Sequence, residues 1–134
     1  AQVSAGTMTA APSFTGGKHM PESFDSEERW PQCAMVIGDV RDQSKCGCCW
    51  AFAATGTASD RLCIYTNGSV MVPLSPQELC FCAKSNGCEG GWLGSAWHYI
   101  RDRGLVTGGQ YQGTGPFSNS SLCASFSLPR CHHG

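Results

Sequence analysis

The chain has 134 residues, with nine basic and ten acidic side chains that leave a formal net charge of −1. This length favours a single domain or part of one. The near-neutral charge excludes the basic surface on which nucleic-acid binding depends. Ten cysteines in so short a chain indicate an oxidising compartment and argue against the cytosol.

Residues 1–19 are small, polar and rich in Gly, so they predict an extended or disordered arm before a folded body that begins near Met20. They contain no apolar run of the kind that signal peptides carry. The longest stretch without charge, residues 104–129, is too rich in Gly, Ser and Thr to cross a membrane. Two acceptor sequons, at Asn67 and Asn119, fit passage through a secretory pathway.

The first predicted helix covers residues 50–64, which are rich in Ala. Several residues in it recur at helical spacing and predict one face of a buried central helix. These residues are Trp50, Ala53, Ala54, Thr57, Arg61 and Ile64.

Two further helices follow from their end signals. Ser75 as N-cap, Pro76 at the first helical position and Glu78 three residues on form a capping box. Residues 94–103 make the third helix, which Gly104 ends by adopting a left-handed conformation. Its apolar stripe consists of Leu93, Ala96, Trp97 and Ile100. Leu105 and Val106 begin either a short strand or an extended loop.

The densest chemical signal is residues 43–52, with the sequence QSKCGCCWAF. This Gly-containing turn delivers Cys49 to the start of the first helix, where unpaired N–H groups and the helix dipole favour an anion. We therefore expect a lowered pKa and a reactive thiolate at Cys49. The same N–H groups, with the carboxamide of Gln43, can stabilise an oxyanion.

Residues 43–52 resemble the active-site segment of papain-family cysteine peptidases, whose signature is Cys-Gly-Ser/Ala-Cys-Trp/Tyr. Six further segments resemble the cathepsin B-like branch of that family, in the same order along the chain. They are MPESFD (20–25), WPQC (30–33), SDRLC (59–63), GCEGG (87–91), GLVTGG (104–109) and PRCHH (129–133). The resemblance implies a papain-like two-lobe α+β fold, of which residues 20–134 cover the mainly helical N-terminal lobe and residues 1–19 the end of a propeptide.

The resemblance also implies roles for individual residues. Cys49 is the expected nucleophile, which attacks the scissile carbonyl and forms a thioester, and Gln43 helps to hold the oxyanion. Trp50 is expected to pack beside the site. Gly90 and Gly91 are expected to form a backbone edge that an extended substrate approaches closely because they lack Cβ atoms. Trp92 then flanks the substrate subsites.

His132 and His133 resemble the histidine pair of the occluding loop, which binds the C-terminal carboxylate of substrates and confers carboxydipeptidase activity. The catalytic His and Asn of the family follow the nucleophile by roughly 130–150 residues, beyond position 134. We therefore expect an endopeptidase or carboxydipeptidase whose catalytic machinery is incomplete in this chain. The alternative is a non-catalytic, disulfide-rich module that binds peptides or acts as a decoy.

By resemblance, Cys33 pairs with Cys63 and Cys46 pairs with Cys88. Two cysteines depart from the family pattern: Cys48 stands where the signature has Ser or Ala, and Cys80 has no counterpart. The pairing of these two, and of Cys82, Cys123 and Cys131, stays open.

Rival chemistry has weaker support in the sequence. Residues 46–49 also fit the pattern of a Cys-x-x-Cys redox pair. Such a pair belongs near a βαβ unit, and the sequence shows no βαβ pattern. Cys131, His132 and His133 lack the spacing and the fourth ligand of a zinc site, so we expect no metal and no cofactor. Expected partners are peptide or protein substrates, cystatin-type inhibitors and the propeptide, in a lysosomal or secreted setting, without nucleic acid or membrane.

Overall fold

The computed structural model describes residues 21–83, 87–109 and 117 of the chain. These residues form five α-helices and one 3-10 helix, and β pairing among them is confined to two isolated bridges. The helices are α1 (Ser26–Arg29), η1 (Pro31–Cys33), α2 (Ala34–Ile37), α3 (Cys49–Tyr65), α4 (Pro76–Cys82) and α5 (Leu93–Arg103). Within the described ranges, no helix combines the length and the apolar character needed to cross a membrane.

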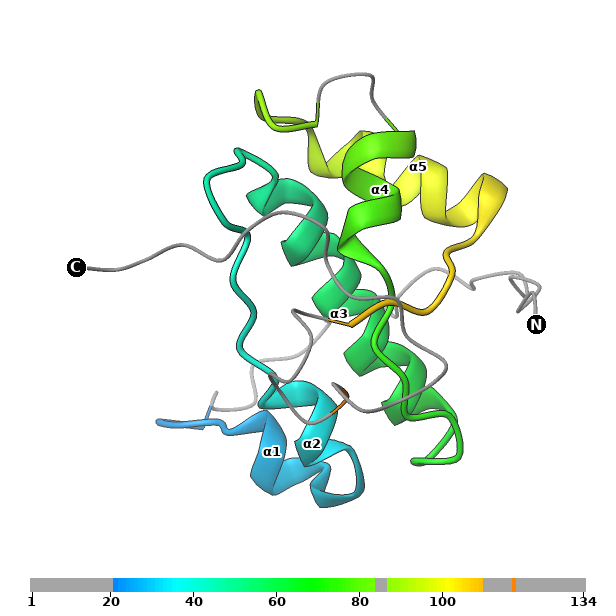
Figure 1. Cartoon of the computed structure of the whole chain (residues 1–134). Helices are drawn as coiled ribbons and strands as arrows, with labels where there is room; N and C mark the ends of the chain where they lie inside the picture. Colours follow the sequence, from blue (N-terminus) through cyan, green and yellow to red (C-terminus); the bar gives the residue numbers. More distant parts are fainter. Residues whose placement is uncertain (1–20, 84–86, 110–116, 118–134) are drawn as a thin grey trace, which may run out of the picture.

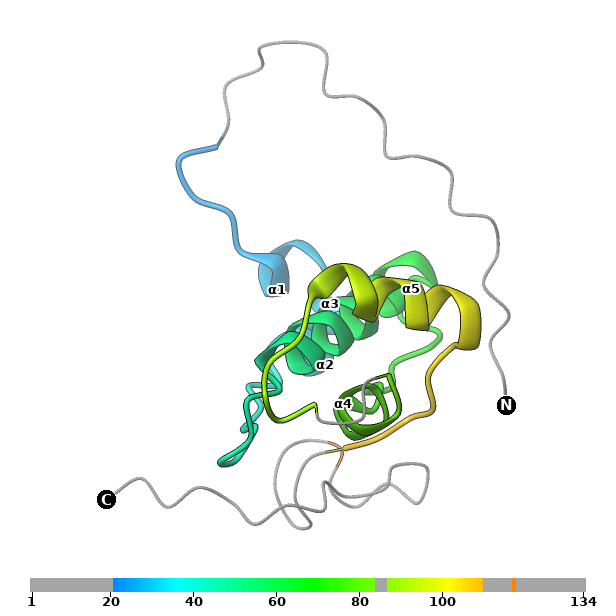
Figure 2. The same cartoon turned by 90° about the horizontal axis from the view of Figure 1, so that it is seen from above.

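Helix α3 forms the centre of the structure, with α4 and α5 packed against its N-terminal part and α2 beside it (Figure 1). Seen from above, α4 is viewed nearly end-on, whereas α5 is viewed from the side and crosses over α3 (Figure 2). The core is accordingly built around one long helix. Its bounds, Cys49–Tyr65, confirm the predicted helix over residues 50–64 to within one residue at each end.

The buried face of α3 differs from the predicted one. Ala53 and Arg61 are exposed, whereas Thr55 and Ser59 are fully buried. The physical reason is local: the Thr55 hydroxyl donates to the Ala51 carbonyl at 2.9 Å and the Ser59 hydroxyl to the Thr55 carbonyl at 2.7 Å. Because these hydroxyls are satisfied within the helix, they can face the core at little cost.

Helix α4 begins as predicted, but only half of the expected capping box is present. The Ser75 hydroxyl accepts from the Glu78 N–H at 3.1 Å, while the Ser75 N–H donates to the Val106 carbonyl. The Glu78 carboxylate does not return to Ser75. It accepts instead from the Val106 N–H at 2.7 Å and from the Tyr99 hydroxyl at 3.3 Å. Glu78 thus joins the start of α4 to α5 and the segment that follows it.

Helix α5 spans Leu93–Arg103, and Gly104 ends it as the C-cap at the predicted position; its φ of 77° favours glycine, but its ψ of −173° lies outside the left-handed helical region that the sequence predicted. Ala96 is fully buried, but Leu93 is 50% exposed, so the apolar stripe is only partly covered. Leu105 and Val106 lead into an isolated antiparallel bridge between Thr107 and Leu74. The segment is therefore an extended loop with one point of pairing.

Three short helices precede α3, and the sequence patterns did not predict them. The Asp25 carboxylate caps α1 by accepting from the N–H groups of Glu27 and Glu28. A disulfide between Cys33 and Cys63 then fastens η1 to the far end of α3 and confirms the pairing implied by the resemblance. Both cysteines are fully buried beside Val36, in a cluster separate from the main core.

Candidate functional site

The candidate site is built on the turn that leads into α3. Cys49 is the first residue of that helix and is exposed, whereas its neighbours Cys48 and Trp50 are buried. Among the described residues, nothing accepts a hydrogen bond from the Cys49 N–H. The predicted arrangement, a solvent-facing thiol at a helix N-terminus, is present.

The turn is fixed to residues 88–90 by covalent and hydrogen bonds. Cys46 forms a disulfide with Cys88, which confirms the second pairing implied by the resemblance. The Gly47 N–H donates to the Cys88 carbonyl at 2.8 Å, and the Gly90 N–H donates to the Gly47 carbonyl at 3.0 Å. A Cβ on Gly47 would lie 2.4 Å from the Cys88 oxygen, so this close pairing requires a glycine.

Gln43 folds back onto the turn. Its Nε2 donates to the Cys46 carbonyl at 2.9 Å, and the side chain is half-buried. A carboxamide nitrogen carries two N–H groups, so this bond occupies one of them and the other remains for a further acceptor. The bond holds the carboxamide close to the start of α3.

Gly90 and Gly91 need to be glycines for two different reasons. Gly90 has a φ of 85° and open space around its Cα, so its backbone conformation is what favours glycine. A Cβ on Gly91 would lie 2.4 Å from the Trp50 indole. That indole is 5% exposed, and its Nε1 donates to the Gly87 carbonyl at 3.1 Å. Trp50 therefore packs beneath the glycine segment, whereas Trp92 is 82% exposed.

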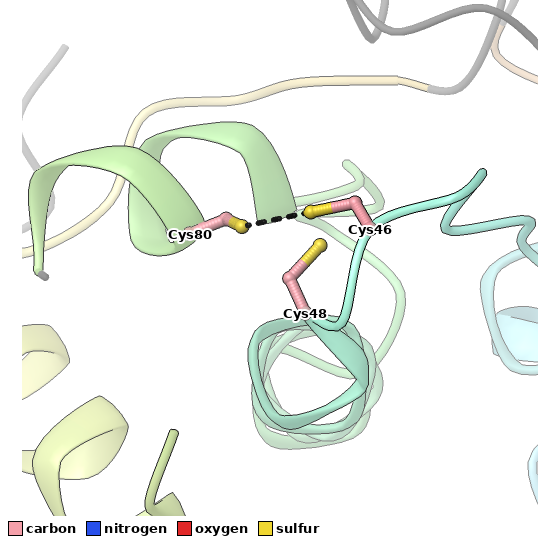
Figure 3. A group of neighbouring side chains, drawn as sticks. All are labelled: Cys46, Cys48 and Cys80. Carbon is pink, nitrogen blue, oxygen red and sulfur yellow. Dashed lines mark hydrogen bonds between the residues drawn. The ribbon is translucent and has the colours of Figure 1, made fainter. Parts of the chain in front are cut away.

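Two further cysteines, Cys48 and Cys80, lie in contact with each other in the core. The side chains of Cys48 and Cys80 are fully buried and in contact, and the Cys80 Sγ lies 3.8 Å from the Cys46 Sγ (Figure 3). Burial raises the pKa of the Cys48 thiol. Burial and then the neighbouring Cys48 raise the pKa of Cys80 to about 12. Both thiols thus stay protonated at neutral pH, and the exposed free cysteines of the described part are Cys49 and Cys82.

Sequence reasoning did not bring Cys48 and Cys80 together. The sequence contained one indication that they pair: both cysteines depart from the family pattern. Because they stand 32 positions apart, local patterns could not show that they meet. The structure also removes one rival interpretation. Because Cys46 is bonded to Cys88, it does not form a Cys-x-x-Cys redox pair with Cys49.

Other predicted residues lie away from this turn or outside the described ranges. Asn67 is exposed in the turn after α3, where its Oδ1 accepts from the Gln32 amide at 3.1 Å. His132, His133 and Asn119 lie outside the described residues.

A hollow of about 190 Å³ lies beside α3. A buried ion pair between Arg41 and Asp39, with an N–O distance of 3.1 Å, forms part of its wall. Burial raises the pKa of Asp60 on the same wall; Arg41 opposes this shift and Asp39 adds to it. The remaining lining residues are Val36, Ile37, Phe52 and Gly56.

Residues 20–133 match the papain family cysteine proteases. A cathepsin B-like cysteine proteinase of Schistosoma japonicum is 41% identical over 116 residues, which are 85% of this chain and 32% of that protein. Cathepsin B-like cysteine proteinase 5 of Caenorhabditis elegans is 47% identical over 107 residues, covering 74% of this chain and 31% of that protein. The chain thus spans about a third of the length of these curated relatives.

Solved structures are also similar to this chain. ProCathepsin B S9 from Trypanosoma congolense superposes with a TM-score of 0.59 at 40% identity, covering 67% of this chain and 31% of that one. A chain of the Haemonchus galactose containing glycoprotein complex gives a TM-score of 0.56 at 28% identity, with 81% and 57% covered. A solvent-facing Cys49 at the head of the central helix, the family match over residues 20–133 and these likenesses lead to one conclusion: the chain belongs to the papain family of cysteine proteases.

Proposed function

We propose that the protein hydrolyses peptide bonds through a thioester on Cys49. The observation that supports this most directly is the placement of Cys49 as the exposed first residue of a 17-residue helix, on a turn held by a disulfide and two backbone hydrogen bonds. The N-terminal N–H groups of a helix stabilise a thiolate there. The substrates are peptides or proteins.

In the proposed reaction, the Cys49 thiolate attacks the scissile carbonyl carbon and the carbonyl oxygen becomes an oxyanion. The Cys49 N–H and the Gln43 carboxamide donate to that oxygen. Collapse of the tetrahedral intermediate breaks the C–N bond, and the leaving amine takes a proton from an imidazolium. Water then hydrolyses the thioester. The imidazole and its orienting Asn are proposed to lie downstream of residue 134, at the family's spacing.

The substrate would lie along residues 90–92. A Cβ at Gly90 would meet nothing within 4 Å, and Trp92, two residues on, is 82% exposed. His132 and His133 are proposed to bind a substrate carboxylate, which adds carboxydipeptidase activity to endopeptidase activity. Residues 1–19 are proposed to belong to a propeptide, and residues 20–134 to the N-terminal lobe of the peptidase domain.

Lysosomal or secreted localisation, glycosylation at Asn67 and Asn119, and inhibition by cystatin-type proteins are proposed on the same basis. The exposure of Asn67 is compatible with glycan attachment. Each of these proposals depends on family membership and can fail without affecting the role of Cys49.

The test is covalent labelling of the full-length protein with an active-site-directed epoxide, followed by tryptic mapping. Cleavage at Lys45, Arg61 and Lys84 separates the peptide 46–61, which contains Cys49, from the peptide 62–84, which contains Cys82. We expect label on 46–61, and its loss together with peptidase activity in Cys49→Ser.

Cys82→Ser is the matched control, because Cys82 is also exposed and, within the described part of the chain, free, but it is the last residue of its helix. This variant should keep both label and activity. Equal labelling of 46–61 and 62–84 would contradict an activated Cys49, and a protein without label or hydrolysis would favour the binding or decoy module.

A further inference from the structure

Three cysteine sulfur atoms lie close together between α4 and the turn that leads into α3. The Sγ atoms of Cys46, Cys48 and Cys80 all lie within 4.8 Å of one another, and all three residues are buried. Cys46 and Cys48 belong to the turn before α3, and Cys80 projects from α4 toward them (Figure 3). Cys46 is already bonded to Cys88, so the cluster contains one disulfide and two thiols.

We propose that Cys48 and Cys80 form a third disulfide, which ties α4 to the N-cap residue of α3, the residue before Cys49. Three observations support this pairing. Both side chains are fully buried, and they contact each other. The two disulfides already present in this part of the chain indicate conditions that oxidise cysteine. Cys48 and Cys80 are also the two cysteines that depart from the family pattern, and the fold places one against the other.

Closing the bond requires an oxidant, which we assign to the disulfide class that secretory compartments supply. The two S–H bonds break, one S–S bond forms, and the pair gives up two protons and two electrons. One external disulfide takes these up and becomes two thiols. The raised pKa values of Cys48 and Cys80 slow thiolate attack once the pair is buried. Once formed, the bond is shielded from reductants because both cysteines are fully buried.

Other arrangements of these sulfurs are less favourable. Exchange of Cys80 with the Cys46–Cys88 bond, across the 3.8 Å contact, would free Cys88 and release its hold on the turn. Cys49 and Cys82 are exposed and therefore lie outside the buried cluster. A soft metal ion bound by all three sulfurs would need Cys46 to be reduced, at the expense of the disulfide already present.

The first test is tryptic mapping of the full-length protein, produced in a secretory host and kept free of reductant. The peptide 46–61 contains Cys46, Cys48 and Cys49, the peptide 62–84 contains Cys63, Cys80 and Cys82, and the peptide 85–101 contains Cys88, so fragmentation of each linked pair identifies the bonded cysteines. With the proposed bond, 46–61 is linked to both of the other two. If 46–61 is linked to 85–101 alone, or if a link joins Cys46 to Cys80, the proposal is wrong.

The second test counts free thiols in the denatured, unreduced protein. If the proposed bond exists, Cys48→Ser and Cys80→Ser each gain one free thiol per molecule over the unmodified protein, and the double variant returns to the original count. If both residues are free, the single variants lose one thiol and the double variant loses two, which overturns the proposal. So does native mass spectrometry that finds a bound metal ion with all three sulfurs reduced. If a single variant fails to fold, the mapping of the unmodified protein still decides.

Neither measurement depends on peptidase activity. A protein with the bond and no hydrolytic activity would leave this proposal standing while the proposed function fails. A protein that hydrolyses peptides but lacks the Cys48–Cys80 bond would support the proposed function and overturn this proposal.

Discussion

Replacing Gly91 with Ala tests how the buried Trp50 indole supports the site. The added Cβ would lie 2.4 Å from the indole Cε2, 2.5 Å from Cδ2 and 2.7 Å from Nε1. The indole has little room to yield, because it is 5% exposed and its Nε1 bonds to the Gly87 carbonyl. Either the ring or the backbone of residues 90–92 must therefore move.

Overpacking of this kind costs about 1–3 kcal/mol, and loss of the Nε1 hydrogen bond adds about 1 kcal/mol. We therefore expect Gly91→Ala to lower the free energy of unfolding by about 2–4 kcal/mol. Gly94→Ala is the matched control: its Cβ would meet nothing within 4 Å on helix α5, so it should gain up to about 1 kcal/mol from helix propensity.

Urea unfolding followed by tryptophan fluorescence measures both variants in the full-length protein. The rate of epoxide labelling at Cys49 is the second readout, because Trp50 is the next residue in the chain. Labelling should slow in Gly91→Ala and remain unchanged in Gly94→Ala. If the two variants are equally stable, the indole does not constrain position 91 and the packing argument fails.

Three further predictions concern the surrounding structure. Leu79→Ala should lower the free energy of unfolding by about 2–5 kcal/mol, because Leu79 is fully buried in the main core; a loss below 1 kcal/mol in urea unfolding would contradict that. Ser75→Ala should cost about 1 kcal/mol in the same assay through loss of the α4 N-cap, and Ser75→Gly should cost less. Burial raises the pKa of Asp60, so this carboxyl binds its proton more tightly in the folded protein than in the unfolded chain. The free energy of unfolding should therefore fall as the pH rises from the ordinary Asp pKa through the raised one. Asp60→Asn should flatten that part of the stability–pH curve, and an unchanged curve would exclude Asp60 as its cause.

The elements that the sequence predicted well are those whose signals are local. The cap at Ser75 and the stop at Gly104 each depend on a few adjacent residues, so both appear where the patterns placed them. The α3 helix was predicted from its composition, but its buried face was not. Spacing of apolar residues does not reveal that the hydroxyls of Thr55 and Ser59 are paired inside the helix.

Features that join distant residues were beyond local reasoning. The Glu78 carboxylate bonds to Val106, 28 positions away, in place of the cap that its spacing from Ser75 suggested. Helices α1 and α2 have four residues each, too few for a periodic pattern to be recognised, and a disulfide fastens the adjoining η1 to α3. The requirement for glycine at position 91 also comes from a tertiary contact, with Trp50. The motif alone attributes that requirement to the approach of a substrate.

The turn before α3 brings together three cysteines, and the fold gives each a different chemical environment. Cys46 has no thiol because it is bonded to Cys88, and Cys48 is fully buried with a raised pKa. Cys49 alone among them is a free thiol that meets solvent. Since alkylation and peptide cleavage both need an accessible sulfur, burial selects the reacting atom before any difference in intrinsic reactivity applies. In Cys80→Ser, which leaves Cys48 without its proposed partner, burial of Cys48 should therefore still confine alkylation of the folded protein within residues 46–61 to Cys49.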